Sequence, residues 1–398
     1  MDKINHNNTP ILFNFVKSII INTFNPEMLE IKEIRDRKGL KQFVTFPFSV
    51  YKGNKYWVPP IIKDELKQLS RDSNPFFKNL DGKFWTAWKD GHCVGRIGAL
   101  VDHAYNKKIG SKMGRITRME FIDDAGVSKG LFDTAENWIR EQGMEAVHGP
   151  LGLSNLDNQG LLIEGFDHLP SIASVYHLPY YKEHFESNGY EKENDWLEFR
   201  LSLGETALNK GKRGSEIVKK RYGFEVHKFT TNAEMQEYLF PVFHLLNEAF
   251  EDLPYVIHFD DDMIRAIGDK YFKVLNPKFV RVVKKDGELV AFIIGIPSLS
   301  SAMQKANGKL FPFGVYHVLK AMKKPEVIDL YLTGVSPKYH TSGAAVILFA
   351  EIQEEMMNQG ITQMETTGVF ETNHNVISNW KNYDHIQHKR RRCFVKKV

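Results

Sequence analysis

The residues that most suggest chemistry lie in "VSPKYHTSGAA", residues 335 to 345, between an apolar run typical of a strand and a helical pattern. Gly343 and the two alanines after it leave the backbone at the helix start uncovered, so another group could approach it closely. The first N–H groups of a helix lack intrahelical partners and lie at the positive end of its dipole, which favours anions. This pattern predicts an anion-binding site. A plain helix start, with Thr341 or Ser342 as N-cap, is the alternative.

The elements that would position this stretch occur twice. "TAWKDGHCVGRIGALV" (86–101) and "RVVKKDGELVAFIIGIP" (281–297) each indicate two strands joined by a Lys-Asp-Gly turn. An amphipathic helix with aromatic residues precedes each hairpin, and a helix closed by Gln-Gly, at Gly143 and Gly360, follows it. Each half then ends with a short helix, an aromatic residue and a polar strand. A repeated order of elements predicts two domains of one plan.

We place the two predicted α/β domains at residues 28–204 and 205–398, joined through the polar stretch "GETALNKGKRGSE". Residues 1–27 are predicted to be an N-terminal extension. Its apolar part, residues 10–24, is shorter than the roughly 20 residues that a membrane span requires. One continuous mixed domain remains the alternative to this division.

The composition is typical of a soluble globular protein: 398 residues, net charge +4, 42% apolar and 26% charged residues. This charge is too small and too dispersed to predict nucleic-acid binding. The one basic cluster, Lys-Arg-Arg-Arg at 389–392, is interpreted as a solvated strand edge. The only two cysteines, Cys93 and Cys393, lie in strand-like runs. They predict neither a disulfide framework nor a metal site, and they favour a reducing cytoplasm.

The order of elements resembles that of the GNAT acyltransferase superfamily. The family motif Arg/Gln-x-x-Gly-x-Gly/Ala is similar to residues 340–345, "HTSGAA", with His340 in place of the usual Arg or Gln. The preceding "LTGVSPKY" and the later "ETTGVFETNHNVISNWKNYD" also resemble family signatures. In the first half, residues 148–181 resemble a subfamily of uncharacterised, two-lobed bacterial GNAT-like proteins. More loosely, they are similar to bacterial N-acyltransferases that make ceramide-like lipids.

The resemblance implies an α/β (α+β) fold of tandem GNAT-like domains, each with a mixed, mostly antiparallel sheet flanked by helices. It also implies acyl-CoA as co-substrate, bound by the second half, and no metal. The residues expected to hold the cofactor are Val335, His340, Thr341, Ser342, Gly343, Ala344, Ala345 and Asn373. The first half has Asp123 and Asp124 at its corresponding helix start, where carboxylates would repel a diphosphate, so we expect no cofactor there.

Acyl transfer to nitrogen needs a neutral amine, and a carboxylate can remove the extra proton. The candidate catalytic residues are Asp157, Glu164, Asp167, Glu365 and Tyr383. The candidate substrate contacts are Asn155, Tyr180, Tyr181 and Tyr331. Trp380 stands where many GNAT enzymes have an acidic tyrosine, so either Tyr383 replaces it or the thiol leaves unaided. A bulge in the fourth strand, expected near Gly334 and Val335, would supply an N–H to the oxyanion.

These features predict an N-acyltransferase that moves an acyl group from acyl-CoA to a small-molecule or lipid amine, a sphingoid amine included. The expected location is the cytoplasm or the membrane periphery. Residues 314–324, "GVYHVLKAMKK", are interpreted as a helix packed on the core, with a basic amphipathic helix at a membrane surface as the alternative. The competing functions are a catalytically inactive GNAT-like pair that binds a ligand or serves as a scaffold, and a Fem-like aminoacyl transferase.

Overall fold

The computed structural model describes residues 29–171 and 173–398, so the predicted extension and its apolar stretch lie outside the described residues. The elements of the first half are β1 (Glu30–Glu33), α2 (Arg37–Thr45), α3 (Pro47–Val50), α4 (Ile62–Gln68), η1 (Pro75–Lys78), β2 (Leu80–Lys89), β3 (His92–Asp102), α5 (His103–Ile109), β4 (Met113–Phe121), α6 (Ala125–Glu141), β5 (Ala146–Gly149), β6 (Leu161–Glu164), α7 (Tyr181–Ser187) and β7 (Glu191–Ser202). Those of the second half are α8 (Glu205–Tyr222), β8 (Glu225–Lys228), α9 (Asn232–Glu237), α10 (Leu239–Ala249), α11 (Asp261–Tyr271), η2 (Pro277–Phe279), β9 (Val280–Lys285), β10 (Glu288–Pro297), α12 (Ser300–Ala306), α13 (Gly314–Lys323), β11 (Val327–Val335), η3 (Pro337–Tyr339), α14 (Ala344–Asn358), β12 (Gln363–Thr366), β13 (Val369–Phe370), α15 (His374–Asn379), η4 (Trp380–Asn382) and β14 (Asp384–Lys397).

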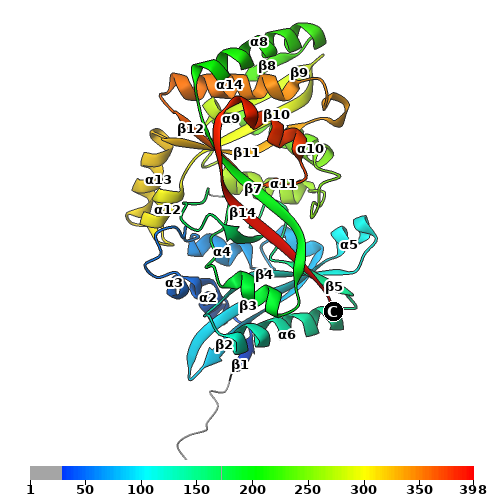
Figure 1. The fold of residues 1–398 in the computed structure, drawn as a ribbon, viewed down its shortest axis with the longest axis vertical. Coiled ribbons are helices and arrows are strands. Elements are labelled where there is room, and N and C mark those ends of the chain that lie inside the picture. The colour runs from blue at the N-terminus through cyan, green and yellow to red at the C-terminus, as the bar shows by residue number, and fades with distance from the viewer. Residues whose placement is uncertain (1–28, 172) are drawn as a thin grey trace, which may run out of the picture.

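One sheet runs through the whole molecule, in the order β1-β2-β3-β4-β5-β14-β7-β12-β11-β10-β9-β8. The pairs β4–β5 and β11–β12 are parallel, and the other pairs are antiparallel. Figure 1 shows α8 and α14 at one end, α6 at the other, and the long strands β7 and β14 running between them. This arrangement confirms the predicted mixed, mostly antiparallel α/β fold.

Both predicted hairpins are confirmed. Lys89 pairs with His92 across a two-residue turn, and Lys285 pairs with Glu288 across another. In each turn the Asp and the Gly have positive φ, 48° and 76° in the first and 51° and 85° in the second. This is the type I′ geometry, whose twist matches that of the flanking strands and which favours Asp-Gly.

The last strand of the chain joins the two halves. β14 pairs with β7 along almost its whole length, and at Phe394 and Val395 it also pairs with Gly149 and His148 of β5. β7 in turn pairs with β12 of the second half. The largest apolar core likewise contains residues of both halves, among them Phe43 and Phe243. The division at residue 204 stays a prediction.

The interpretation of the basic cluster as a solvated strand edge is wrong. The basic stretch 389–392 is no solvated edge, because β14 is a central strand in which Lys389 and Arg391 are 1% and 3% exposed. The Nε of Arg391 donates to the fully buried carboxylate of Glu198 at 2.5 Å. This ion pair offsets the free-energy cost of burying the two charges. The polar stretch between the halves is helical: it lies in α8, which packs along α14.

The core-packing interpretation of residues 314–324 holds only in part. Of the apolar face expected to pack on the core, Val315, Val318 and Met322 are half-buried, whereas Leu319 is exposed. The stretch does form the helix α13, but only Gly314 of that helix is buried. Leu319, which was expected on the core-facing side, is 58% exposed. Within the described residues, no helix combines the length and the apolar character needed to cross a bilayer.

Candidate functional site

An opening between two parallel strands defines the candidate site. β11 and β12 pair only from Val327 to Leu330 and from Gln363 to Thr366. The next residue, Thr367, still donates its N–H to the carbonyl of Leu330 at 3.4 Å, but β13 then pairs with β7 instead. The two strands therefore separate beyond Leu330, and the rest of β11 leads directly to the start of α14. A strand opening beside a helix start can admit an extended ligand between the two strands.

The segment between β11 and α14 is a compact turn. The carbonyl of Val335 lies 2.8 Å from Nε2 of His340, so this nitrogen carries the proton and the ring is turned back onto the strand. Ser342 donates its hydroxyl to the carbonyl of Tyr339 and accepts the N–H of Ala344 at 3.2 Å. Gly343 has φ of 87°, a conformation that favours glycine. Gly343, not Thr341 or Ser342, is therefore the N-cap of α14, and Ser342 accepts the first helical N–H from the position before it.

The small residues at this helix start have a second use. A Cβ at Gly343 would lie 3.0 Å from Cγ2 of Val218 on α8, and one at Gly214 would lie 3.2 Å from Cγ1 of Val346. Close packing of α8 on α14 therefore requires a glycine at position 343, one of the small residues that suggested an anion site. Ala345, which is half-buried, is not part of these two contacts and is a cleaner position at which to test anion binding.

A shallow cavity of about 390 Å³ lies beside the same turn. Its lining residues are Tyr222, Lys285, Asp286, Glu288, Lys338, Tyr339, Thr341 and Ser342. The hydroxyl of Thr341 and the two lysine ammonium groups suit phosphate oxygens, whereas the two carboxylates oppose them and the Ser342 hydroxyl already donates to Tyr339. The cavity therefore supplies hydrogen-bond donors for a phosphate without an excess of positive charge.

Glu365 lies at the closed end of the opening. Its side chain is 7% exposed and accepts a hydrogen bond from Nε of Arg200 on β7 at 2.7 Å. Burial raises the pKa of this carboxyl, and the neighbouring Arg200 offsets only part of the rise. In register, Glu365 is flanked by Asp329 on β11 and by Arg200, so the three form a row across the sheet. A carboxylate with a raised pKa is a stronger base than an ordinary one.

The loop of the first half, residues 148–181, is fixed across the strands next to Glu365. Nζ of Lys389 donates to the carbonyls of Gly165 and His168 at 2.8 and 2.6 Å. Arg391 donates to the carbonyl of Gln159, and Ser174 donates to Glu198 at 2.6 Å. On the other side, Ser300 of α12 donates to the carbonyl of Pro170 at 2.6 Å. These bonds place the loop against β14 and β7, beside Lys389, whose charge acts on Glu365.

The three carboxylates predicted on this loop occupy different surroundings. Asp157 is bound by Arg118 at 2.9 and 3.0 Å and also accepts two backbone N–H groups. Its pKa is lowered, because burial, which would raise it, is outweighed by Arg118. Glu164 and Asp167 have largely exposed side chains, 58% and 80%. The geometry thus gives Asp157 a positioning role and brings neither of the other two into the opening.

Tyr331 is the residue that approaches the loop from the second half. It is the extra residue of a bulge in β11, since Leu330 and Leu332 pair with the consecutive Gly295 and Ile294. The bulge was expected at Gly334 and Val335, but both of these pair regularly with β10. The Tyr331 ring lies 5.1 Å from that of Tyr271. Burial, Tyr271 and then Asp157 raise its pKa, so Asp157 and Tyr331 share one region between the halves.

The remaining predicted residues lie elsewhere. Tyr180 and Tyr181 both donate to the carbonyl of Phe121 at the end of β4. The side chain of Asn373 caps α15 by accepting the N–H of Val376 at 3.2 Å. Tyr383 donates its hydroxyl to Gln353 of α14 at 3.0 Å, and burial raises its pKa to about 12. Asn155 lies on the loop, and its buried Oδ1 has no hydrogen-bond partner among the described residues.

Four charged or titratable residues at the site were missed. Arg200, Arg391, Lys389 and His388 come from the polar strands β7 and β14, whose charge had indicated exposure to solvent. Burial lowers the pKa of Lys389 to about 8 and that of His388 to about 4. In register, Lys389 lies opposite Glu198 and Arg392 opposite Asp195, but neither strand alone indicates this pairing.

The helix start of the first half that corresponds to that of α14 is the start of α6. Asp124 caps α6 by accepting the N–H of Val127 at 3.0 Å and forms an ion pair with Lys89 at 2.6 Å. A carboxylate therefore already occupies this helix start. We keep as a prediction that the first half holds no cofactor.

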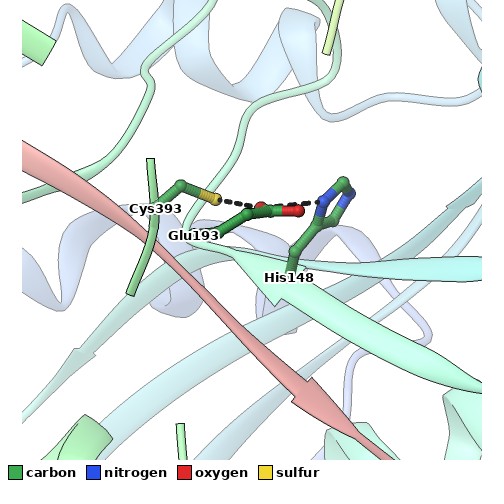
Figure 2. Close-up of side chains that lie close together, drawn as sticks. All are labelled: His148, Glu193 and Cys393. Atoms are coloured by element: carbon green, nitrogen blue, oxygen red, sulfur yellow. Dashed lines mark hydrogen bonds and ion pairs between the residues drawn. The ribbon is translucent and has the colours of Figure 1, made fainter. Parts of the chain in front are cut away.

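A second buried polar cluster lies where β5, β7 and β14 meet (Figure 2). Sγ of Cys393 and Nδ1 of His148 lie 3.3 and 3.4 Å from the same oxygen of Glu193, which also accepts the hydroxyl of Tyr255 at 2.8 Å. Among the described residues, His148, Glu193 and Cys393 are the one group close enough to hold a metal ion. A thiol and a phenol that donate to one carboxylate give the same spacing, so the geometry does not require an ion.

Comparisons with known proteins agree with this fold. No family model matches the chain. It is 27% identical to Protein YghO of Escherichia coli over 375 residues, 92% of this chain and 95% of that protein. It is 25% identical to the bacterial ceramide synthase of Caulobacter vibrioides over 363 residues, 87% of this chain and 91% of that protein.

Two solved structures are similar at low identity. A tandem GNAT protein from the clavulanic acid biosynthesis pathway has a TM-score of 0.54 at 13% identity, covering 93% of this chain and 98% of that one. A GCN5-related glucosamine N-acetyltransferase region of a fungal β-N-acetylglucosaminidase has a TM-score of 0.55 at 12% identity, covering 93% of this chain and 38% of that one. These similarities confirm the predicted fold: the chain is a protein of the tandem GNAT fold.

Proposed function

We propose that the protein is an acyl-CoA-dependent N-acyltransferase with its reaction centre at the opening between β11 and β12. One observation carries the proposal: the two strands separate beside the start of α14, with the buried carboxylate of Glu365 at the point of separation. The opening gives a thioester a path into the sheet, and the helix start faces its phosphates. The carboxylate lies where an attacking amine would lose its proton.

In this reaction Glu365 acts as the general base. An ordinary amine with a pKa near 10.4 is neutral in only about one molecule in 10³ at pH 7, so it needs an acceptor for its proton. The raised pKa of Glu365 makes that transfer less unfavourable. Acyl-CoA supplies the activated acyl group, and its thiolate, which is weakly basic, leaves without an acid. This route needs no proton from Tyr383, whose hydroxyl is bound to Gln353.

The start of α14 holds the diphosphate of the cofactor. The backbone N–H groups from Gly343 to Ala345 are the donors, and the hydroxyls of Thr341 and Ser342 line the neighbouring cavity. Binding requires Ser342 to share or release the N–H of Ala344. The loop 148–181 forms the wall on the acceptor side, since Lys389 fixes it beside Glu365.

A lipid amine is the acceptor class that we favour. The relative from Caulobacter vibrioides is named a bacterial ceramide synthase and matches this chain over 87% of its length. The experiment is a panel of acyl-CoAs of two to eighteen carbons against amino acids, polyamines and sphingoid amines, with released thiol as the measurement. Thiol release with sphingoid amines alone supports the lipid acceptor. CoA binding without thiol release for any acceptor would favour the scaffold function instead.

The cofactor site has its own test in Ala345→Asp. An aspartate in the first turn stabilises the helix by about 0.3–1 kcal/mol, so the fold should not suffer. The same charge repels a diphosphate, and we expect the Kd for CoA to rise at least about tenfold, equivalent to about 1.4 kcal/mol. The matched control is Ala345→Asn, which has the same shape without the charge. Equal affinity of both variants and the original protein in calorimetry would contradict the site.

A further inference from the structure

The segment between β10 and β11 exposes large apolar side chains that nothing in the described chain covers. Phe311 and Phe313 are 78% and 77% exposed, and Tyr316 and Leu319 of α13 are 63% and 58% exposed. Four such residues within nine positions are far denser than elsewhere on the described surface, where exposed large apolar residues are mostly scattered. Large exposed apolar side chains gathered in one segment, unlike scattered ones, indicate an interaction site. We call residues 305–324 the apolar-basic segment.

The charge around these side chains has one sign. Lys305, Lys309, Lys320, Lys323 and Lys324 are all exposed. No acidic residue occurs between Glu288 and Glu326 in the sequence. Within the described residues, none of these five lysines forms an ion pair with a carboxylate. Exposed aromatic and leucine side chains surrounded by unpaired lysines are the composition of a surface that inserts among anionic lipid headgroups.

The segment is firmly connected to the rest of the molecule. The amide of Gln304 on α12 donates to the carbonyls of Lys55 and Trp57 at 2.8 and 3.0 Å. The N–H of Ile62 donates to the carbonyl of Gly308 at 3.0 Å. Figure 1 shows α12 and α13 together on one side of the molecule, next to α3 and α4. The same α12 binds the loop 148–181 through Ser300 and Pro170, so the segment lies at one edge of the acceptor wall.

We propose that the apolar-basic segment docks the protein on a bilayer that contains anionic lipids. Phe311, Phe313, Tyr316 and Leu319 enter the headgroup region, and the five lysines contact the phosphates. Docking at this edge lets an amphiphilic amine pass from the bilayer to the acceptor wall without crossing water. That last step rests on the proposed acyltransferase function, whereas the docking itself does not.

The test is co-sedimentation of the full chain with vesicles of phosphatidylcholine alone and of phosphatidylcholine with 30% phosphatidylglycerol. We expect binding to the anionic vesicles, weakened at least about tenfold by Phe313→Ser with Leu319→Ser. Ile217→Ser is the matched control, because Ile217 is 66% exposed on α8, away from the segment, and should leave binding unchanged. The pair Lys320→Glu with Lys323→Glu should weaken anionic binding by roughly fivefold or more per lysine. Lys107→Glu with Lys112→Glu, equal in charge, should have little effect.

Several results would overturn the proposal. One is equal binding to both vesicle types, or binding that the variants of the segment leave intact. Another is binding lost on deletion of residues 1–27 but kept in Phe313→Ser with Leu319→Ser, which would assign it to the extension. A concentration-dependent dimer that Leu319→Ser dissociates, without vesicle binding, would make the segment a contact between copies. The variants are also assayed for thiol release with a soluble amine. If this release is unchanged while vesicle binding is lost, docking has failed and the acyltransferase function has not.

Discussion

Glu365→Gln is the change that tests the proposed reaction most directly. The amide keeps the shape of the side chain and can still accept a hydrogen bond from Arg200, but it cannot accept a proton from the amine. General bases contribute about 10²–10⁴-fold to rates. We therefore expect kcat at pH 7 to fall about 10²–10³-fold, while the Kd for CoA, which depends on the start of α14, stays within about twofold.

The pH dependence gives a second and sharper expectation. Without a base, the variant depends on the fraction of amine that is already neutral, which rises tenfold per pH unit below the amine pKa. The deficit of Glu365→Gln should therefore shrink by about tenfold for each pH unit between 7 and 9. The original protein should instead level off above the raised pKa of Glu365. A deficit of the same size at every pH would refute the role of base.

Stability separates this role from a structural one. Folding raises the pKa of the Glu365 carboxyl, so this group binds more protons in the folded than in the unfolded state. It therefore lowers the stability of the protein as the pH rises from its ordinary pKa through the raised pKa. Above the raised pKa that penalty is fully present, and the neutral glutamine should remove it. We expect Glu365→Gln to unfold at the same temperature as the original protein or higher. The control is Glu355→Gln on α14, whose carboxylate also pairs with an arginine, Arg281, but which should keep full activity.

Two further predictions concern the strands that join the halves. Arg391→Ala leaves the fully buried carboxylate of Glu198 without its cation and should lower the free energy of unfolding by about 3–5 kcal/mol. The control Arg390→Ala removes a side chain that is 26% exposed and should lower it by at most about 1 kcal/mol. Equal losses in urea titrations would contradict the burial of β14. Cys393 is fully buried, and burial raises the pKa of its thiol well above the ordinary value. A thiol reagent should therefore modify only Cys93 in the folded protein and both cysteines after denaturation. Labelling of Cys393 in the folded protein, identified by mass spectrometry, would contradict its packing.

Local conformational demands made part of this fold predictable. The Lys-Asp-Gly turns needed two consecutive residues with positive φ, a demand that few sequences meet. The helices α6 and α14 end where Gly143 and Gly360 adopt φ of 78° and 75°, as the Gln-Gly pairs indicated. Each of these signals is complete within a few residues, so a single sequence contains all the information required.

The pairing of distant charges was not predictable in this way. Arg391 and Glu198 are separated by 193 positions, and each alone indicates exposure to solvent. In the register of β14 on β7, Glu198 lies opposite Lys389 and diagonal to Arg391, and only the folded structure shows that Arg391 pairs with it. The site residues supplied by these strands, Lys389 among them, were missed for the same reason. For α13 the error was the reverse, because burial was expected where the structure shows exposure. The apolar face of a helix does not indicate whether protein or another apolar environment covers it.

The two halves differ at the one place where their shared plan would form an opening. In the first half, the chain after β5 stays against β4, since the N–H of Leu151 donates to the carbonyl of Ile116 at 2.8 Å. In the second half, the chain after β12 leaves β11 and pairs with β7. The segment that closes the first opening is the beginning of the loop 148–181, and Lys389 and Arg391 hold later parts of that loop beside Glu365. A single loop therefore covers β4 in one half and lies beside Glu365 in the other. Because one loop makes both sets of contacts, the difference between the two halves at this place is one structural feature and not two.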